Sequence, residues 1–299
     1  MSNTVIELNG LTKRYGASRG VDNVSLEVQQ GEVFGFLGPN GAGKTTTIRL
    51  LLDLLRPTSG HARLFGLDAR AGSREIHART GYLPGELGLA ERMTVGQQLE
   101  YFGNLRGGVP RARVEALATR LDLDLVKPVR SLSRGNKQKV GIVQAFMHEP
   151  ELLILDEPTG GLDPLMQQEF NALVKEAAAA GATVFLSSHI LPEVETLCDR
   201  VGIIREGQLV AAEDVATVRQ RAVRRIAARY RRAPVAKLVA DLPGVAAVRV
   251  EGGTLHCTVQ GDTGPAVRAL ATEDLLDLTV GEPSLEDVFL GYYGRGRSQ

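Results

Sequence analysis

Short apolar runs alternate with segments of helical character over about the first 210 residues of the chain. Residues 32–37 (EVFGFL), 152–155 and 183–187 are runs of the kind found in the buried strands of parallel sheets. Residues 4–8 and 24–28 also have the pattern of strands, and they flank a glycine-rich turn. Strands that alternate with helices predict an α/β domain built around a mostly parallel sheet.

Four segments of this region are predicted to be helices: residues 45–55, 93–106, 111–121 and 133–147. A break that contains glycine and proline separates the second from the third. Residues 201–204 and 208–210 surround Glu206-Gly207, which predicts a hairpin.

The pattern changes after about residue 215. Seven arginines lie between residues 217 and 232, where Ile226, Ala228 and Tyr230 alternate with polar positions. We interpret the arginines as a solvated face and the alternation as a half-buried strand. The elements predicted after it are a helix at 235–241, strands at 247–251 and 254–259, a helix at 265–276 and a strand at 278–281. The resulting order, βαββαβ, predicts a small ferredoxin-like α+β unit.

Length and composition limit the classes of protein. The 299 residues suggest about two domains, and 43% hydrophobic with 23% charged residues is ordinary for a globular protein. The 35 basic residues balance 35 acidic ones, which gives no support to a general affinity for nucleic acid. Cys198 and Cys257 are isolated in the sequence, which favours a reducing compartment. We find no secretory leader, and no apolar stretch reaches the length of about 18 residues that spans a bilayer. We therefore expect a cytoplasmic protein without a membrane span.

Residues 38–46 (GPNGAGKTT) are the strongest indication of a binding site in the sequence. They fill the pattern G-x-x-x-x-G-K-[ST] of the phosphate-binding loop, between a predicted strand and a predicted helix. The glycines let backbone N–H groups turn toward an anion, and the helix N-terminus favours negative charge. Lys44 is expected to reach the terminal phosphates, and the Thr45 hydroxyl to ligate Mg²⁺. The residues of the loop expected to bind the nucleotide are Gly38, Pro39, Asn40, Gly41, Ala42, Gly43, Lys44, Thr45 and Thr46.

Three later segments narrow the choice among nucleotide-binding families: residues 132–140 (LSRGNKQKV), 152–163 (LLILDEPTGGLD) and 187–189 (SSH). Together with the phosphate loop, this order resembles the nucleotide-binding domain of ATP-binding cassette (ABC) transporters over roughly residues 4–212. The first of the three is the most specific, because its place just before a strand ending in Asp-Glu is peculiar to that family.

The resemblance implies a phosphate-loop ABC ATPase core, with antiparallel and helical subdomains beside the mostly parallel sheet. We expect a nucleotide-binding domain over residues 1–215, with its helical subdomain at about 85–147. Residues 216–299 are then a C-terminal accessory α+β domain, whose role we leave open between regulation, dimerisation and completion of the fold.

The resemblance also implies roles for single residues, with ATP and Mg²⁺ as cofactors. Asp156 would hold Mg²⁺ opposite Thr45. Glu157 would polarise the attacking water. His189 would contact the γ-phosphate and hold the geometry of water and glutamate. Tyr15, in KRYG, resembles the aromatic residue that stacks on adenine, although a surface tyrosine is a fair rival.

Ser133 and Gly135 lie at the start of the predicted helix 133–147, where a hydroxyl cap and free N–H groups suit an anion. In the family this second site meets ATP that is bound to another domain. Two chains are therefore expected to sandwich two nucleotides, with Asp163 near the seam. A monomer should bind ATP and hydrolyse it poorly.

The chain departs from the family pattern in two segments. Gly85 stands where the family usually has a glutamine, and it cannot ligate Mg²⁺ through a side chain. Glu86 beside it either substitutes for the glutamine or leaves the loop a purely coupling role. Arg134 and Asn136 stand where glycine and glutamine are commoner in the family. Such variants resemble cassettes of the ABC-2 export type. Arg134 either adds positive charge at the γ-phosphate or faces solvent.

Export through a separate membrane permease is the expected function. In the family, the helical segment 85–147 receives the coupling helices of such a partner. The ending 282–289 (EPSLEDVF), followed by Tyr292-Tyr293, resembles ABC-2 type ATPases of bacterial drug, antibiotic or lipid exporters. The permease would hold the chain on the inner face of the membrane. Two alternatives are a soluble ABC ATPase acting on nucleic acid or ribosomes, and a weakly active regulatory subunit.

Overall fold

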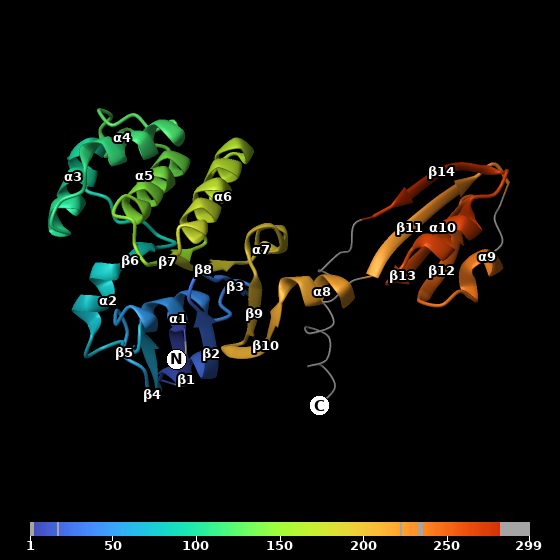
Figure 1. Cartoon of the computed structure of the whole chain (residues 1–299), viewed down its shortest axis with the longest axis horizontal. Coiled ribbons are helices and arrows are strands. Elements are labelled where there is room, and N and C mark those ends of the chain that lie inside the picture. Colours follow the sequence, from blue (N-terminus) through green and yellow to red (C-terminus); the bar gives the residue numbers. More distant parts are fainter. Residues whose placement is uncertain (1–2, 17, 222, 233–235, 282–299) are drawn as a thin grey trace. The chain divides into compact units, whose positions relative to one another are not determined.

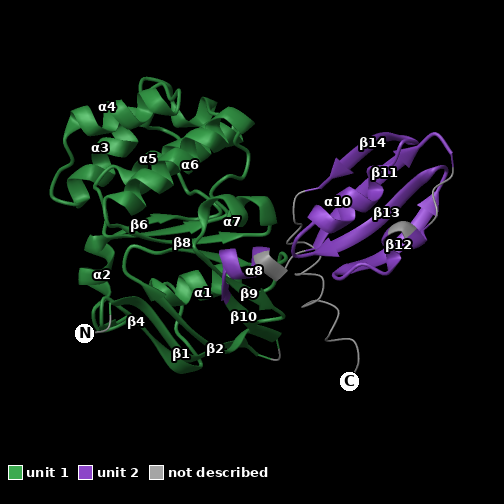
Figure 2. Ribbon diagram, turned by 45° about the vertical axis from the view of Figure 1, so that its right-hand side comes forward, with its two compact units in different colours: residues 1–212 green, residues 213–299 purple. Residues whose placement is uncertain are grey.

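The chain divides into two compact units in a computed structural model, Met1–Ala212 and Glu213–Gln299 (Figures 1 and 2). The structure describes residues 3–16, 18–221, 223–232 and 236–281. The ending 282–289 and Tyr292-Tyr293, which we compared with exporter ATPases, lie outside the described residues.

The first unit is built on a six-stranded sheet of order β10-β9-β3-β8-β7-β6. Its strands are β3 (Val33–Leu37), β6 (Thr80–Leu83), β7 (Leu152–Asp156), β8 (Thr183–Ser188), β9 (Arg200–Arg205) and β10 (Gln208–Asp214). From β9 through β6, all neighbouring strands are parallel, as the apolar runs predict. The segments that follow β3, β7 and β8 therefore leave the same edge of the sheet.

A second, antiparallel sheet of order β2-β1-β4-β5 lies below the first in Figure 1. It contains β1 (Thr4–Tyr15), β2 (Ser18–Gln29), β4 (Ser59–Leu64) and β5 (Leu67–Asp68). Helix α1 (Lys44–Leu51) contacts strands of both sheets. The core around α1 joins Ile48 to Leu11 of β1 and to Phe34 and Phe36 of β3, all fully buried. The loop that precedes α1 is thus fixed at both ends by buried elements.

The other helices of this unit are α2 (Ser73–Arg79), α3 (Val95–Leu105), α4 (Arg111–Arg120), α5 (Arg134–Phe146), α6 (Pro164–Ala179) and α7 (Leu191–Leu197). Side chains cap three of them at the N-terminus. Thr94 forms a capping box with Gln97 before α3, and Ser133 and Asp163 accept backbone N–H groups at the starts of α5 and α6.

The predicted helix 45–55 was too long at its C-terminal end. Helix α1 ends at Leu51, and Asp53 has a left-handed backbone with φ of 51°. The N–H groups of Leu54 and Leu55 both turn back to the carbonyl of Arg49, which closes the helix. The apolar spacing continues past this point because Leu55 still packs on the core.

The second unit contains α8 (Val215–Arg221), β11 (Val223–Tyr230), α9 (Lys237–Ala240), β12 (Val245–Glu251), β13 (Thr254–Gln260), α10 (Gly264–Leu270) and β14 (Leu275–Val280). Its antiparallel sheet has the order β12-β13-β11-β14, and the elements after α8 follow the predicted βαββαβ order. Ile226, Ala228 and Tyr230 are buried, which confirms the half-buried strand. The predicted helix 265–276 was too long, because Leu275 pairs with Tyr230 in β14.

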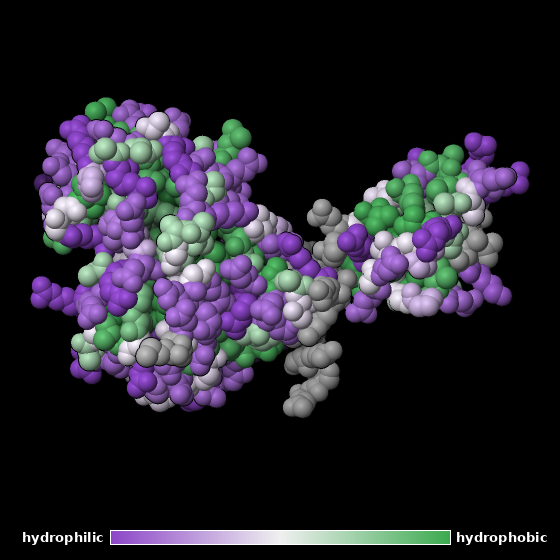
Figure 3. All heavy atoms as spheres, in the orientation of Figure 1, coloured by the Kyte–Doolittle hydropathy of each residue, from purple (hydrophilic) through white to green (hydrophobic). Residues whose placement is uncertain are grey.

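Hydrophilic and hydrophobic residues are interspersed over the visible face of the first unit (Figure 3). Among the described residues, no helix has the length and apolar character that crossing a bilayer requires.

His148, just after α5, makes stability depend on pH. Both ring nitrogens are buried. Burial and the positive charge of Arg106 lower the pKa of His148 from 6.5 to about 4. Between these values the unfolded chain binds more protons than the folded chain, so stability falls as the pH falls from about 6.5 toward 4.

We expect His148→Leu to reduce the acid sensitivity of folding. After allowance for partial exposure of the ring, the titration contributes about 1 kcal/mol between pH 7 and 5, or about 2–4 °C in Tm. Thermal melts of both proteins at the two pH values measure it. An equal drop in Tm for wild type and variant would contradict the assignment.

Candidate nucleotide site

The loop of residues 38–46 connects β3 to α1 at the carboxyl edge of the parallel sheet. A Cβ at Gly38 would lie 2.4 Å from the carbonyl oxygen of Ile204. Gly43 has φ of 111°, and a Cβ there would lie 2.8 Å from the carbonyl oxygen of Gly20. Both positions therefore require glycine. The tight course of the loop brings its backbone to the N-terminus of α1, whose first N–H groups have no carbonyl partner within the helix.

The Lys44 side chain is buried, with 5% of its surface exposed, at the centre of this site. Its Nζ donates hydrogen bonds to the carbonyl oxygens of Gly38, at 2.6 Å, and Pro39, at 3.2 Å. It also lies 3.2 Å from Oε1 of Glu157. The three protons of the ammonium group are thus matched by three oxygens.

Asp156, the last residue of β7, is 1% exposed and faces the loop. Its Oδ2 accepts a hydrogen bond of 2.8 Å from the Thr45 hydroxyl. Nearby, burial and the Asp156 charge raise the pKa of Tyr82 to about 12, so this phenol stays neutral at ordinary pH. Two adjoining oxygens, a hydroxyl and a carboxylate, are donors that suit Mg²⁺.

Glu157 follows β7 directly and is one-third exposed. Its Oε2 lies 3.1 Å from Nδ1 of His189, which follows β8. Its backbone N–H donates to the carbonyl oxygen of Ser187 at 3.1 Å, and its φ is 49°. A left-handed backbone is uncommon for glutamate, and it turns the carboxylate toward Lys44 and His189. The predicted catalytic residues Lys44, Glu157 and His189 are therefore in contact.

Gly85 lies against the carboxylate of Asp156. A Cβ at this position would be 3.4 Å from Oδ2 of Asp156, which is ordinary van der Waals contact. A longer side chain would therefore begin beside the Thr45–Asp156 pair. Glu86 is exposed, and no hydrogen bond or ion pair holds its side chain among the described residues.

Tyr15 is 47% exposed. Gly20 has the Tyr15 ring and the Thr46 methyl as neighbours: a Cβ there would lie 2.8 Å from Cε2 of Tyr15 and 3.2 Å from Cγ2 of Thr46. The end of the phosphate loop and the Tyr15 ring therefore lie close together.

Ser133 and Gly135 are not joined to the phosphate loop by any hydrogen bond or ion pair in the described parts of the chain. Gly135 packs instead on Gly161: a Cβ at Gly135 would lie 2.5 Å from the carbonyl oxygen of Gly161. In the next turn of α5, Gln138 donates a 2.8 Å hydrogen bond to the carbonyl of Pro158. The start of α5 is thereby tied to the loop after Glu157, a link that the sequence motifs do not indicate.

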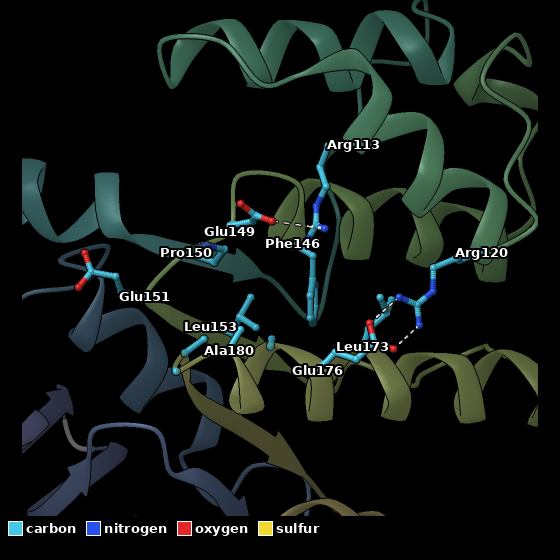
Figure 4. Close-up of a pocket in the computed structure, with 13 residues that line it drawn as sticks. Arg113, Arg120, Phe146, Glu149, Pro150, Glu151, Leu153, Leu173, Glu176 and Ala180 are labelled. Carbon is cyan, nitrogen blue, oxygen red and sulfur yellow. Dashed lines mark hydrogen bonds and ion pairs between the residues drawn. The ribbon is translucent and has the colours of Figure 1, made fainter.

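A cavity of about 470 Å³ lies at the other end of the sheet (Figure 4). Phe146 and Leu153 line it, and the Arg113–Glu149 and Arg120–Glu176 ion pairs stand at its rim. Leu153 lies near the amino end of β7, whereas Asp156 ends the strand. The cavity is therefore separate from the phosphate loop.

Comparisons with known proteins show the family. The sequence profile described as "ABC transporter" matches residues 21–160. The bacitracin transport ATP-binding protein BcrA of Bacillus licheniformis is 42% identical over 210 residues, which are 69% of this chain and 69% of that protein. The chain belongs to the ABC transporter family. It is an ATP-binding subunit of that family, as the motifs predict.

Two further ABC proteins are similar to this chain. The probable multidrug ABC transporter ATP-binding protein YbhF of Escherichia coli is 38% identical over 214 residues, covering 70% of this chain and 37% of that protein. A solved structure described as the ATP binding subunit of an ABC transporter is 33% identical, with a TM-score of 0.67 over 73% of this chain and 92% of that one. The predicted ABC ATPase fold is confirmed.

Proposed function

We propose that this chain is the ATP-hydrolysing subunit of an ABC-2 type exporter, which drives a membrane permease to export a drug-, antibiotic- or lipid-like substrate. The observation that carries the proposal is the meeting of Lys44, Thr45, Asp156, Glu157 and His189 at one edge of the sheet. The names of the relatives, for bacitracin and multidrug transport, support the class of substrate.

ATP binding would use the loop of residues 38–46. Its backbone N–H groups and the N-terminus of α1 would cradle the phosphates, and Lys44 would contact the terminal ones. Tyr15, beside Thr46, offers an exposed ring on which adenine can stack. Thr45 and Asp156 would hold Mg²⁺, which supplies positive charge to the phosphate oxygens when it is bound.

Hydrolysis would use Glu157 as the base that accepts a proton from the attacking water. Its left-handed backbone and the 3.1 Å contact with His189 orient the carboxylate. His189 is about half exposed, so its ring is also accessible to the γ-phosphate of a bound nucleotide.

A second chain would complete the site. Ser133 and Gly135 stand at the N-terminus of α5, and among the described residues no hydrogen bond or ion pair joins them to the loop of their own chain, as expected for groups that bind a nucleotide held by another subunit. To change the ratio of closed to open dimers from 1:99 to 99:1, the nucleotides must favour the closed state by about 5.5 kcal/mol. Two shared nucleotides are the proposed source of that free energy.

The permease would dock on the helical segment 85–147. Tyr101 and Leu105 stand one turn apart on α3, and they are 51% and 66% exposed. Large apolar side chains on an exposed helix face suit a partner helix. In this arrangement the chain sits on the inner face of the membrane.

Affinity purification from the native membrane is expected to recover a polytopic membrane protein. The double variant Tyr101→Glu with Leu105→Glu should reduce this recovery at least tenfold while ATP binding is retained. Val210→Glu, at an exposed apolar residue of β10, is the matched control. Recovery of ribosomes or DNA with no membrane protein would instead support a soluble ABC ATPase.

A further inference from the structure

Ser187 connects the Asp156 carboxylate to the backbone of Glu157. It is the next-to-last residue of β8, its side chain is fully buried, and it stands opposite Asp156 across the β7–β8 ladder. Its hydroxyl donates a 2.5 Å hydrogen bond to Oδ1 of Asp156. The Oγ of Ser187 also accepts a 3.2 Å hydrogen bond from the backbone N–H of Glu157. One side chain therefore contacts the last residue of β7 and the residue that follows it.

Both oxygens of Asp156 are held in this arrangement. Thr45 donates to Oδ2 and Ser187 donates to Oδ1, so the plane of the carboxylate is fixed. The Thr45 hydroxyl and Asp156 are the groups proposed above to hold Mg²⁺, so a bound metal would replace the hydrogen bond between them. The bond from Ser187 lies on the other oxygen and remains available when a metal is bound.

The same hydroxyl acts on Glu157. The left-handed backbone of Glu157 is an uncommon conformation, and its N–H is held by both the carbonyl and the hydroxyl of Ser187. Because a serine hydroxyl donates one proton and also accepts, it can satisfy Asp156 and Glu157 at once. Alanine would lose both hydroxyl bonds and would leave the Glu157 N–H with the backbone carbonyl alone.

We propose that Ser187 is a positioning residue for the ATPase reaction, which sets the Asp156 carboxylate for metal binding and the Glu157 backbone for catalysis. The proposal rests on the roles proposed above for these two residues. A purely structural hydroxyl would affect stability alone, whereas a positioning hydroxyl also changes how nucleotide binding responds to Mg²⁺.

Thr183 provides the matched control. It is a fully buried hydroxyl residue at the opposite end of β8, where its oxygen accepts a 3.0 Å hydrogen bond from the backbone of Gly31. Thr183→Ala and Ser187→Ala each remove one buried hydroxyl from the same strand. Only Ser187 contacts the site, so the difference between the two variants isolates the effect of position.

The experiment titrates the full-length protein with a fluorescent ADP analogue, with and without Mg²⁺. Wild type and Thr183→Ala should bind more tightly when Mg²⁺ is present. Ser187→Ala should lose about tenfold of that gain, and its affinity without metal should stay within about twofold of wild type. In Ser187→Ala, the Mg²⁺ concentration that gives half of the gain in nucleotide affinity should rise by a similar factor. In ATPase assays of this variant, kcat should fall by a larger factor than KM rises.

The outcomes separate the two proposals. If wild type shows no gain with Mg²⁺, the proposed metal role of Thr45 and Asp156 fails. If wild type shows the gain and Ser187→Ala keeps it in full, the positioning role of Ser187 is overturned. If Ser187→Ala does not fold, Ser187→Thr and Ser187→Cys provide the comparison: threonine restores the donor and acceptor and should keep the gain, whereas the weak donor of cysteine should reduce it. Equal gains in these two variants would overturn the proposal.

Discussion

Glu157→Gln is expected to lower ATP turnover by about 10²- to 10⁴-fold, the usual contribution of a positioned general base. The amide has nearly the shape of the carboxylate and can still contact His189, but it cannot accept the proton of the attacking water. Binding of Mg-ATP should be retained, because the phosphate loop and the Thr45–Asp156 pair are unchanged. Phosphate release and nucleotide titration on the same preparation measure the two effects.

Glu151→Gln is the control for this variant. Glu151 precedes β7 as Glu157 follows it, and it forms a surface ion pair with Arg79 at the other end of the sheet. Its replacement should leave turnover unchanged. Turnover by Glu157→Gln near the wild-type rate would exclude Glu157 as the base.

Lys44→Ala is expected to weaken nucleotide binding by about 10- to 150-fold, which corresponds to the 1.5–3 kcal/mol typical of a hydrogen bond to a charged group. The variant removes the cation of the loop and leaves the carbonyls of Gly38 and Pro39 without this donor. Titration with labelled ATP measures the loss, and circular dichroism confirms that the variant folds.

Lys175→Ala, on the exposed surface of α6, removes the same charge away from the site. This control should bind ATP like the wild type. Unchanged affinity in Lys44→Ala would contradict our interpretation of residues 38–46 as a phosphate-binding loop.

The parallel sheet and the phosphate loop could be predicted because their signals are local. The run LLILD is short, apolar and followed by a loop motif, and the phosphate loop is recognised from nine consecutive residues, although the contacts that require glycine at 38 and 43 come from Ile204 and Gly20. Helix ends were less predictable. The apolar spacing that begins α1 continues through Leu55, which packs on the core after the helix has closed at Leu51.

The role that we propose for Ser187 could not be read from the sequence. Ser187 and Asp156 are 31 residues apart, and their hydrogen bond depends on the register between β7 and β8. The motif SSH identifies residues 187–189 but does not indicate which of the two serines contacts the Asp156 carboxylate. Likewise, the sequence identifies Gly85 as a departure from the family, but only the fold places it beside Asp156.

The three oxygens around the Lys44 ammonium have a consequence for the order of events at the site. Any phosphate that binds Nζ must displace one of them, and the Glu157 carboxylate is the one that can leave without moving the loop. With the roles proposed for Lys44 and Glu157, nucleotide entry would be a ligand exchange at a lysine that already has a counter-ion. The arriving phosphate would then free the proposed base when there is a bond for water to attack.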